Sequence, residues 1–279
     1  MARNIYEDIR DLIFRDVMNK RVIAILRVDG DGILAGMERL KNRAKEIGLR
    51  VLKALPSGAE VRKGDIIAVI EGNPKQIAIA EDLLIGIIAK ASGVATAARK
   101  AVELAKGKIR VVCGAWKKMP IEIKELLREA IAIGGAGIRI IDKPFVYLDK
   151  NYVRIFGGIK NTLEAVKGIE NRLKVIQVRG ETKDIVEEAI EAVRYGANII
   201  MIDTGDLSHI ERVSKALRER GLRNKVLLAF GGNIKLEHIP ILAEKDVDII
   251  DVGREIIDAP LLDMKLDVIV VENSSPKNS

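Results

Sequence analysis

The second half of the sequence alternates short apolar runs with amphipathic helical segments. Most residues in the runs are β-branched, and segments such as 181–196 and 207–221 separate them with helical spacing of apolar residues. Six runs follow Lys108: IRVVC (109–113), GIRII (137–141), LKVIQV (173–178), NIIMID (198–203), KVLLAF (225–230) and VDIIDV (247–252). Apolar strands that alternate with helices indicate a parallel sheet buried on both faces. The sequence therefore predicts an α/β fold.

The number of runs limits which parallel fold this is. Six strands, or seven with FVYL at 145–148, are too few for a closed eightfold barrel. Two arrangements remain: an open doubly wound sheet, or an incomplete barrel that a neighbouring subunit closes.

Glycines follow the last two runs and favour the barrel. In AFGGN (229–233) and DVGRE (251–255) they stand at strand ends that lead towards a helix. Free backbone N–H groups at such ends hold phosphates in barrels, whereas no G-x-G-x-x-G of a dinucleotide-binding sheet follows any strand. Tight turns without a ligand are the alternative. The residues expected to bind phosphate are Gly231, Gly232, Asn233, Gly253 and Arg254.

The first hundred or so residues mix short strands with helices. The expected elements are an amphipathic helix over 4–18, a strand over 21–28, a helix ending at Gly48, two short strands around turns at 56–58 and 63–65, and a long helix over 75–107 that breaks near Ser92-Gly93.

The charge is basic but has no nucleic-acid pattern. Lys and Arg number 47 against 40 Asp and Glu, a net charge of +7, while aromatic residues make up 3%. Nucleic-acid surfaces interleave basic residues with aromatics or gather them in a stripe, so we expect no nucleic-acid partner. Abundant Lys, Arg and Glu are also typical of thermophilic proteins.

No targeting or membrane segment is expected. No apolar run approaches the roughly 20 residues that span a bilayer, and the first sixteen residues alternate charged with aliphatic side chains, unlike a signal peptide. We therefore expect a cytoplasmic protein with no membrane partner.

Cysteine and histidine are too scarce to carry the chemistry. Cys113 is the single cysteine, which we expect to be a buried structural thiol, and His209 and His238 are the two histidines. Disulfide scaffolds and clustered-cysteine zinc sites are excluded, and we do not expect a metal site built on histidines. The chemistry must come from Lys, Arg, Asp, Glu and the backbone.

Several segments, in order and spacing, resemble one family over nearly the whole chain. SGVATAARK (92–100) resembles its Ser-Gly-Ile-Ala-Thr segment, GAWKKMP (114–120) its Asp-Thr-Arg-Lys-Thr-x-Pro motif, AIAIGGAG (130–137) its glycine turn, DKNYV (149–153) its Lys-Asp-Asn-His-Val motif, NIIMIDT (198–204) its Ile-Met-Leu-Asp-Asn strand, and AFGGN with residues 247–269 its phosphate loops and closing strand. The chain thus resembles the nicotinate-nucleotide pyrophosphorylase (quinolinate phosphoribosyltransferase) family of type II phosphoribosyltransferases.

The resemblance implies a fold and a function. The fold is an N-terminal α/β sandwich, here residues 1–107 closed by residues 262–272, followed by an open, incomplete parallel α/β barrel over 108–261. The activity is transfer of ribose 5-phosphate from phosphoribosyl pyrophosphate to a pyridine carboxylate, quinolinate or nicotinate, which gives nicotinate mononucleotide in NAD biosynthesis. Quinolinate members also decarboxylate the product. Mg²⁺ is the implied cofactor, and a homodimer or homohexamer the implied assembly.

The resemblance also assigns the central residues. The reaction expels pyrophosphate while positive charge grows on the ribose, so the site needs cations for phosphates and a carboxylate near the ribose. Lys117 matches the lysine of the family's Arg-Lys-Thr motif and becomes the candidate catalytic or pyrophosphate-binding cation. Asp203 ends a buried strand and matches the family's metal- or ribose-binding aspartate. The phosphate-binding glycines would hold the 5-phosphate.

Other cationic positions depart from the family. Arg-Lys-Thr becomes Trp116-Lys117-Lys118, Asn-His-Arg becomes Ile138-Arg139-Ile140, the motif lysine shifts to Lys150, and a second carboxylate becomes Arg179. The candidate substrate-binding residues are therefore Arg139, Lys150, Arg179 and Lys118. Each lost charge-assisted hydrogen bond costs about 1.5–3 kcal/mol. A paralogue with another acceptor base, or a sugar-phosphate binding protein without activity, is the alternative.

Overall fold

The computed structural model describes residues 8–273, which divide into two compact units. The first unit comprises the described residues up to Thr96 together with the segment from Ala259 onwards, and the second comprises Ala97–Asp258. Both are of mixed α/β type, which confirms the expected fold class. No helix within residues 8–273 combines the length and the apolar character needed to cross a lipid bilayer.

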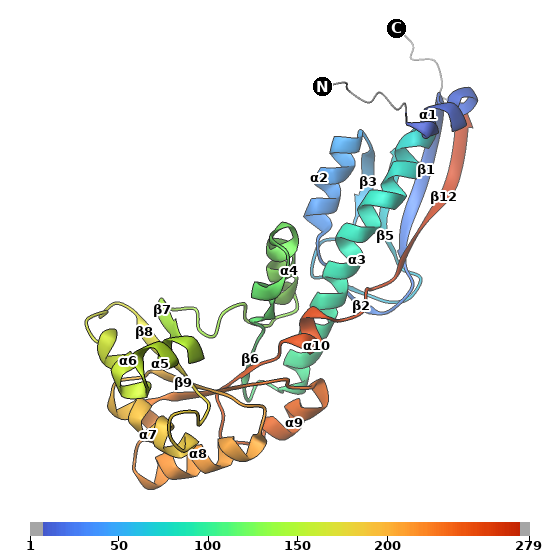
Figure 1. Ribbon diagram of the computed structural model, residues 1–279. Coiled ribbons are helices and arrows are strands. Elements are labelled where there is room, and N and C mark those ends of the chain that lie inside the picture. The colour runs from blue at the N-terminus through green and yellow to red at the C-terminus, as the bar shows by residue number, and fades with distance from the viewer. Residues whose placement is uncertain (1–7, 274–279) are drawn as a thin grey trace, which may run out of the picture. The chain divides into compact units, whose positions relative to one another are not determined.

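The first unit is a four-stranded antiparallel sheet covered by helices on one face. Its elements are α1 (Ile9–Ile13), η1 (Arg15–Val17), β1 (Lys20–Val28), β2 (Gly32–Ile33), α2 (Met37–Ile47), β3 (Arg50–Ala54), β4 (Glu60–Val61), β5 (Ile66–Gly72), the part of α3 (Pro74–Leu104) up to Thr96, and β12 (Met264–Asn273). The sheet order is β12-β1-β5-β3, so the C-terminal strand lies beside β1 (Figure 1). Alternate residues of β1 form one core with the apolar faces of α2 and α3, which makes this unit an α/β sandwich.

Two details of this unit differ from expectation. The opening helix extends only from Ile9 to Ile13 and continues as η1, while residues 4–7 lie outside the described part of the chain. The long helix α3 has no break at Gly93. A Cβ on Gly93 would lie 2.0 Å from the carbonyl oxygen of Pro260. This glycine therefore lets the segment before β12 approach the helix, rather than ending the helix.

The second unit contains a six-stranded parallel sheet and its covering helices. Its elements are β6 (Arg110–Val112), η2 (Ala115–Lys118), α4 (Ile121–Ile133), β7 (Phe145–Leu148), α5 (Lys150–Phe156), α6 (Ile159–Ala165), β8 (Leu173–Val178), α7 (Ile185–Arg194), β9 (Ile199–Asp203), α8 (Leu207–Glu219), η3 (Arg223–Lys225), β10 (Leu227–Gly231), η4 (Leu236–His238), α9 (Ile239–Leu242), β11 (Ile249–Asp251) and α10 (Arg254–Ile257). The strand order is β6-β11-β10-β9-β8-β7. Both faces of the central strands are buried, as the apolar runs predict.

The parallel sheet behaves as an incomplete barrel. Val112 of β6 and Tyr147 of β7 belong to strands at opposite edges, yet both pack in one apolar cluster with residues of the strands between them. Among the described residues no ladder joins β6 to β7. The sheet therefore curls around a shared interior without closing.

The expectation of a strand at residues 137–141 is wrong. Gly137 makes a single bridge to Val112, and residues 138–141 leave the sheet, although Ile140 stays buried in the interior cluster. The next apolar run, Phe145–Leu148, forms the edge strand instead. Burial of isoleucine side chains does not require strand pairing, so the composition of GIRII was misleading.

Candidate active site

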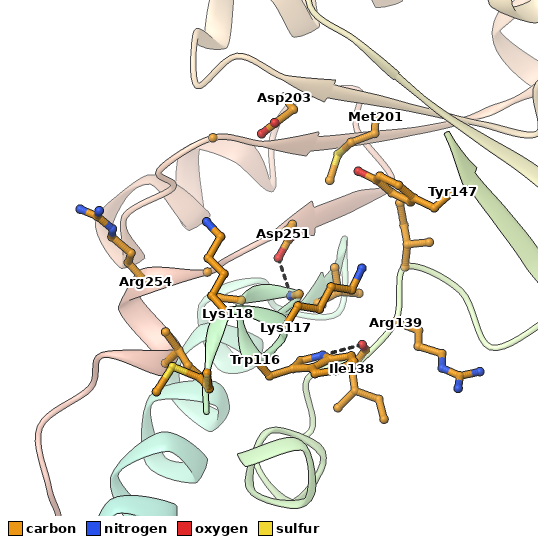
Figure 2. Close-up of a pocket in the computed structure, with 18 of the residues that line it drawn as sticks. Trp116, Lys117, Lys118, Ile138, Arg139, Tyr147, Met201, Asp203, Asp251 and Arg254 are labelled. Carbon is orange, nitrogen blue, oxygen red and sulfur yellow. Dashed lines mark hydrogen bonds between the residues drawn. The ribbon is translucent and has the colours of Figure 1, made fainter. Parts of the chain in front are cut away.

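A cavity of about 910 Å³ opens at the carboxyl ends of the parallel strands (Figure 2). Such ends are where parallel barrels carry their binding sites, because loops from neighbouring strands meet there. The residues that line it are Val112, Gly114–Met119, Ile138–Ile140, Phe145, Tyr147, Met201, Asp203, Gly232, Asn233, Asp251, Gly253, Arg254, Ile257 and Asp258. All of them belong to the second unit.

Most of the sequence-predicted site residues lie around this cavity. Those that line it are Lys117, Lys118, Arg139, Asp203, Gly232, Asn233, Gly253 and Arg254. Gly231 lies directly behind, since a Cβ on it would be 3.4 Å from Oδ1 of Asp203. Lys150 and Arg179 are absent from the lining. The roles assigned to all these residues stay predictions.

Asp203 ends β9 and is held by two neighbours from β8 and its loop. Arg179 donates from Nη1 to the Asp203 carboxylate Oδ2 at 2.9 Å and to its carbonyl oxygen at 2.7 Å. The Gln177 amide also donates to Oδ2. In residues 8–273, these side-chain bonds all fall on Oδ2, so Oδ1 remains available to a ligand in the cavity. Arg179, expected to contact substrate, thus contacts the carboxylate that lines the cavity.

The other cationic side chains predicted for the site point in different directions. Figure 2 shows the Lys118 amino group on the side where Arg254 lies, whereas Lys117 extends towards Tyr147. The Lys117 ammonium stands 5.4 Å from the centre of the Tyr147 ring, within range of a cation–π contact. The Arg139 guanidinium points away from Asp251. Lys150 is exposed at the start of α5, where its backbone N–H donates to Gln177 Oε1 at 2.7 Å.

Two loops meet at the glycines after β10. Gly205, after β9, donates its N–H to the carbonyl oxygen of Gly231 at 3.1 Å. Gly232 has a φ of +106°, and a Cβ there would lie 2.4 Å from the Gly205 nitrogen. Asn233 follows in a left-handed conformation with a φ of +56°. The glycine pair thus brings the ends of β9 and β10 together at the cavity.

Apolar and aromatic side chains form the opposite end of the cavity. Trp116 donates its indole N–H to the carbonyl oxygen of Ile138 at 3.0 Å, and the Arg128 guanidinium lies 4.8 Å from the centre of its ring. Phe145 and Tyr147 of β7 and Met201 of β9 complete this wall. The cavity therefore has a glycine-rich end with Lys118 and Arg254, and an aromatic end that the Lys117 ammonium approaches.

Asp251 is a cavity residue that we did not identify from the sequence. It ends β11, lines the cavity and accepts a hydrogen bond from the Gly114 N–H through Oδ1 at 2.9 Å. Burial raises the pKa of this carboxyl, and the neighbouring Asp203 raises it further, while the Gly114 bond and both lysines of η2 oppose the shift. The signal was present: like Asp203, it is a carboxylate at the carboxyl end of a buried strand.

The raised pKa of Asp251 predicts a stability effect of Asp251→Asn. An acid whose pKa is higher in the folded than in the unfolded protein stabilises the fold below its unfolded pKa, and that contribution is lost as pH rises through the folded pKa. Asparagine keeps the acceptor for Gly114 without charge. We expect the variant to melt at a higher temperature than the wild type at pH 7, by about 2–4 °C for each kcal/mol recovered. Calorimetry at pH 7 and pH 4 should show the difference shrinking at the lower pH; a constant difference would contradict the prediction.

Glu188 was also missed and fixes the loop that carries Arg179. It is 1% exposed on α7 and accepts hydrogen bonds from the backbone N–H groups of Arg179, Gly180 and Thr182 and from the Thr182 hydroxyl, at 2.8–3.0 Å. A buried carboxylate with this many donors is well satisfied. It holds the Arg179 guanidinium against Asp203 through the backbone of the loop.

Glu188→Gln should therefore destabilise the protein. The amide group replaces one acceptor oxygen with a donor that faces backbone N–H groups, and we expect a loss of about 2 kcal/mol in the free energy of unfolding. Glu187→Gln on the same helix is the matched control, because Glu187 is exposed and should change stability by less than about 0.5 kcal/mol. Denaturant titration of both variants provides the measurement. Equal stabilities would show that the loop does not depend on this carboxylate.

Cys113 is a buried thiol, as expected. It is 0% exposed, and its Sγ lies 3.7 Å from the carbonyl oxygen of Gly253. Burial raises the pKa of the thiol to about 12, which keeps it protonated and unsuited to act as a nucleophile.

A magnesium ion in this cavity would have to be bound mainly by substrate. Within residues 8–273 no cluster of three or more His, Cys, Asp or Glu side chains is suited to a metal ion. Mg²⁺, however, usually needs one or two protein carboxylates together with substrate phosphates. Asp203, with Oδ1 available beside the glycine loops, fits that requirement.

Two protein-family models match the sequence, and together they span most of the chain. "Quinolinate phosphoribosyl transferase, N-terminal domain" matches residues 8–92, and "Quinolinate phosphoribosyl transferase, C-terminal domain" matches residues 94–267.

Curated relatives share one name. The chain is 29% identical over 255 residues to a probable carboxylating nicotinate-nucleotide pyrophosphorylase of Archaeoglobus fulgidus, covering 91% of this chain and 96% of that protein. It is 24% identical over 252 residues to the carboxylating nicotinate-nucleotide pyrophosphorylase of Homo sapiens, covering 89% and 83%.

Solved structures of the same name share the fold. The nicotinate-nucleotide pyrophosphorylase from Pyrococcus furiosus superposes with a TM-score of 0.82 at 24% identity, covering 98% of this chain and 78% of that chain. The structure from Francisella tularensis gives 0.79 at 22% identity, covering 95% and 91%.

Proposed function

Because the chain belongs to the quinolinate phosphoribosyltransferase family, we propose that it transfers ribose 5-phosphate from phosphoribosyl pyrophosphate to the ring nitrogen of a pyridine carboxylate. The product is nicotinate mononucleotide, formed directly from nicotinate or from quinolinate with loss of carbon dioxide, and the role is in NAD biosynthesis. The names of the relatives describe a phosphoribosyltransferase, and this chain is an enzyme of that type.

The observation that carries the proposal is the cavity with two chemically different ends. At one end Lys118, Arg254 and the backbone of Gly232, Asn233 and Gly253 offer cations and N–H groups to phosphates. At the other end the aromatic wall accepts a flat heterocycle. A phosphoribosyl donor and an aromatic acid can therefore lie side by side in one site.

In the proposed reaction, Asp203 is the carboxylate that faces the developing charge. As the bond from ribose to pyrophosphate breaks, positive charge grows on the ribose ring, and Asp203 stabilises that charge. Arg179 and Gln177 fix the position of Asp203 through Oδ2. Lys117 and Lys118 neutralise negative charge on the leaving pyrophosphate or the acceptor. Mg²⁺ bound by Asp203 and the substrate phosphates would supply further neutralisation of the pyrophosphate.

The test is a direct assay of the purified protein. With phosphoribosyl pyrophosphate and Mg²⁺, addition of nicotinate or quinolinate should release pyrophosphate and form nicotinate mononucleotide, measured by chromatography. Chelation of Mg²⁺ should slow the release. If neither acid causes pyrophosphate release, the proposal is wrong and the sugar-phosphate binding alternative gains support.

We also propose that the enzyme is a homodimer or homohexamer. Among the described residues β7 pairs with β8 alone, and its open edge supports this assembly because exposed strand edges are otherwise open to non-specific pairing. Light scattering coupled to size-exclusion chromatography should give a mass at least twice the 30.7 kDa of one chain.

A further inference from the structure

We propose that Asp251 selects the acceptor: it admits a pyridine with one carboxylate remote from the ring nitrogen, as in nicotinate, and rejects one with a carboxylate next to that nitrogen, as in quinolinate. This inference rests on the proposed transfer reaction and narrows its substrate.

The space that Asp251 fills is opened by a glycine. A Cβ on Gly114 would lie 3.0 Å from Oδ2 of Asp251, so any side chain at position 114 would compete with this carboxylate. The family motif that GAWKKMP resembles begins with aspartate at this position. Here the carboxylate comes instead from β11, and Oδ1 is anchored by the Gly114 N–H at 2.9 Å.

The two ends of the cavity determine how an acceptor must lie. Lys118 and Arg254 stand at the phosphate end, and Trp116 and Tyr147 belong to the aromatic end (Figure 2). The attacking nitrogen has to meet the ribose where the two ends join. Figure 2 places Asp251 at this junction, between Lys118 and Tyr147.

The substitution pattern of the pyridine then decides which group meets Asp251. In quinolinate one carboxylate is on the carbon adjacent to the nitrogen, so it enters the junction together with the nitrogen. In nicotinate the carboxylate is one carbon farther along the ring. It reaches the aromatic end, where the Lys117 ammonium lies beside Tyr147.

The charges at the junction oppose a second carboxylate. Burial and the neighbouring Asp203 raise the pKa of Asp251, whereas the Gly114 N–H bond, Lys117 and Lys118 favour its ionised form. Phosphoribosyl pyrophosphate brings several further negative charges that engage the cations. Like charges at contact distance in a partly desolvated site repel strongly, so the ionised Asp251 opposes a carboxylate adjacent to the nitrogen.

The experiment compares both acids with the wild type and Asp251→Asn. We expect the wild type to use nicotinate with a kcat/KM roughly 100-fold or more above that for quinolinate. Asp251→Asn should raise kcat/KM for quinolinate at least tenfold and lower the preference for nicotinate over quinolinate at least tenfold. Asparagine is isosteric and keeps the Gly114 hydrogen bond. Asp142→Asn, an exposed site outside the cavity, controls for the change in net charge and should leave the ratio unaltered.

The outcomes separate the inference from the function on which it rests. Efficient use of quinolinate by the wild type, with a ratio that Asp251→Asn does not change, overturns the inference and leaves the transferase assignment intact. Pyrophosphate release with neither acid, in wild type and variant alike, removes both. The inference is supported if Asp251→Asn gains the use of quinolinate and Asp142→Asn does not.

Discussion

Replacing Asp203 with asparagine is expected to lower kcat by roughly 10²–10³-fold with little change in stability. The amide has nearly the same shape but lacks the negative charge that stabilises the ribose as pyrophosphate leaves. The oxygen of asparagine can still accept from Arg179 or Gln177, so the loop contacts around it persist in part. Single-turnover kinetics with phosphoribosyl pyrophosphate and nicotinate would separate this loss in the chemical step from a loss in binding.

A nearby aspartate provides the control for this variant. Asp206 lies in the same loop, outside the cavity lining, and caps α8 by accepting from the Ser208 N–H at 2.9 Å. Asparagine is an equally good cap, so Asp206→Asn should keep kcat near that of the wild type. The role of Asp203 would have to be abandoned if Asp203→Asn retained more than about a third of kcat. Calorimetric titration of Mg²⁺ with phosphoribosyl pyrophosphate would separately test its role as a metal ligand.

Much of the barrel was readable from the sequence because its strands are buried on both faces. Apolar β-branched runs favour strands in that environment, and five of the six named runs do form strands. The exception, GIRII, shows the limit: Ile140 is buried in the interior cluster while its backbone leaves the sheet. The composition of a run indicates that its side chains are buried. It does not show which of two adjacent apolar runs pairs with a neighbouring strand of the sheet.

Glycine was informative in one place and misleading in another. Gly232 and Gly253, which follow β10 and β11, do line a cavity with Asp203 and Lys117. Gly93 resembles a helix breaker, but it lies within a continuous helix where another segment approaches. The difference depends on tertiary packing, which local sequence does not contain.

The charged residues of the site were only partly predictable for the same reason. Asp251 satisfied the rule that selected Asp203, yet no family motif drew attention to it. Arg179 was recognised as a replacement for a carboxylate, but its contact with Asp203 depends on the loop that Glu188 holds. Contacts between side chains from different strands emerge only when the sheet is assembled.

Gly232→Ala is expected to destabilise the protein by about 4 kcal/mol and to weaken binding of phosphoribosyl pyrophosphate. Alanine at a φ of +106° is strained, and its Cβ would lie 2.4 Å from the Gly205 nitrogen and 2.9 Å from the Gly205 Cα. Both atoms are backbone, so neither can rotate away, and the two loops must separate. That movement displaces Gly232 and Asn233, which line the cavity, so a lower melting temperature and a higher KM for phosphoribosyl pyrophosphate should appear together.

Gly196→Ala is the control that separates the effect of backbone strain from the effect of the close contact with Gly205. Gly196 has a φ of +90° with no atom within 4 Å of an added Cβ, so the variant should lose only the roughly 1–2 kcal/mol of left-handed strain and keep its KM. The difference between the two variants, followed by calorimetry and by pyrophosphate release, measures the close approach of the β9 and β10 loops. Equal melting temperatures and unchanged KM values would mean that these loops relax freely, and that the tight packing of Gly232 against Gly205 does not hold the phosphate end of the cavity in place.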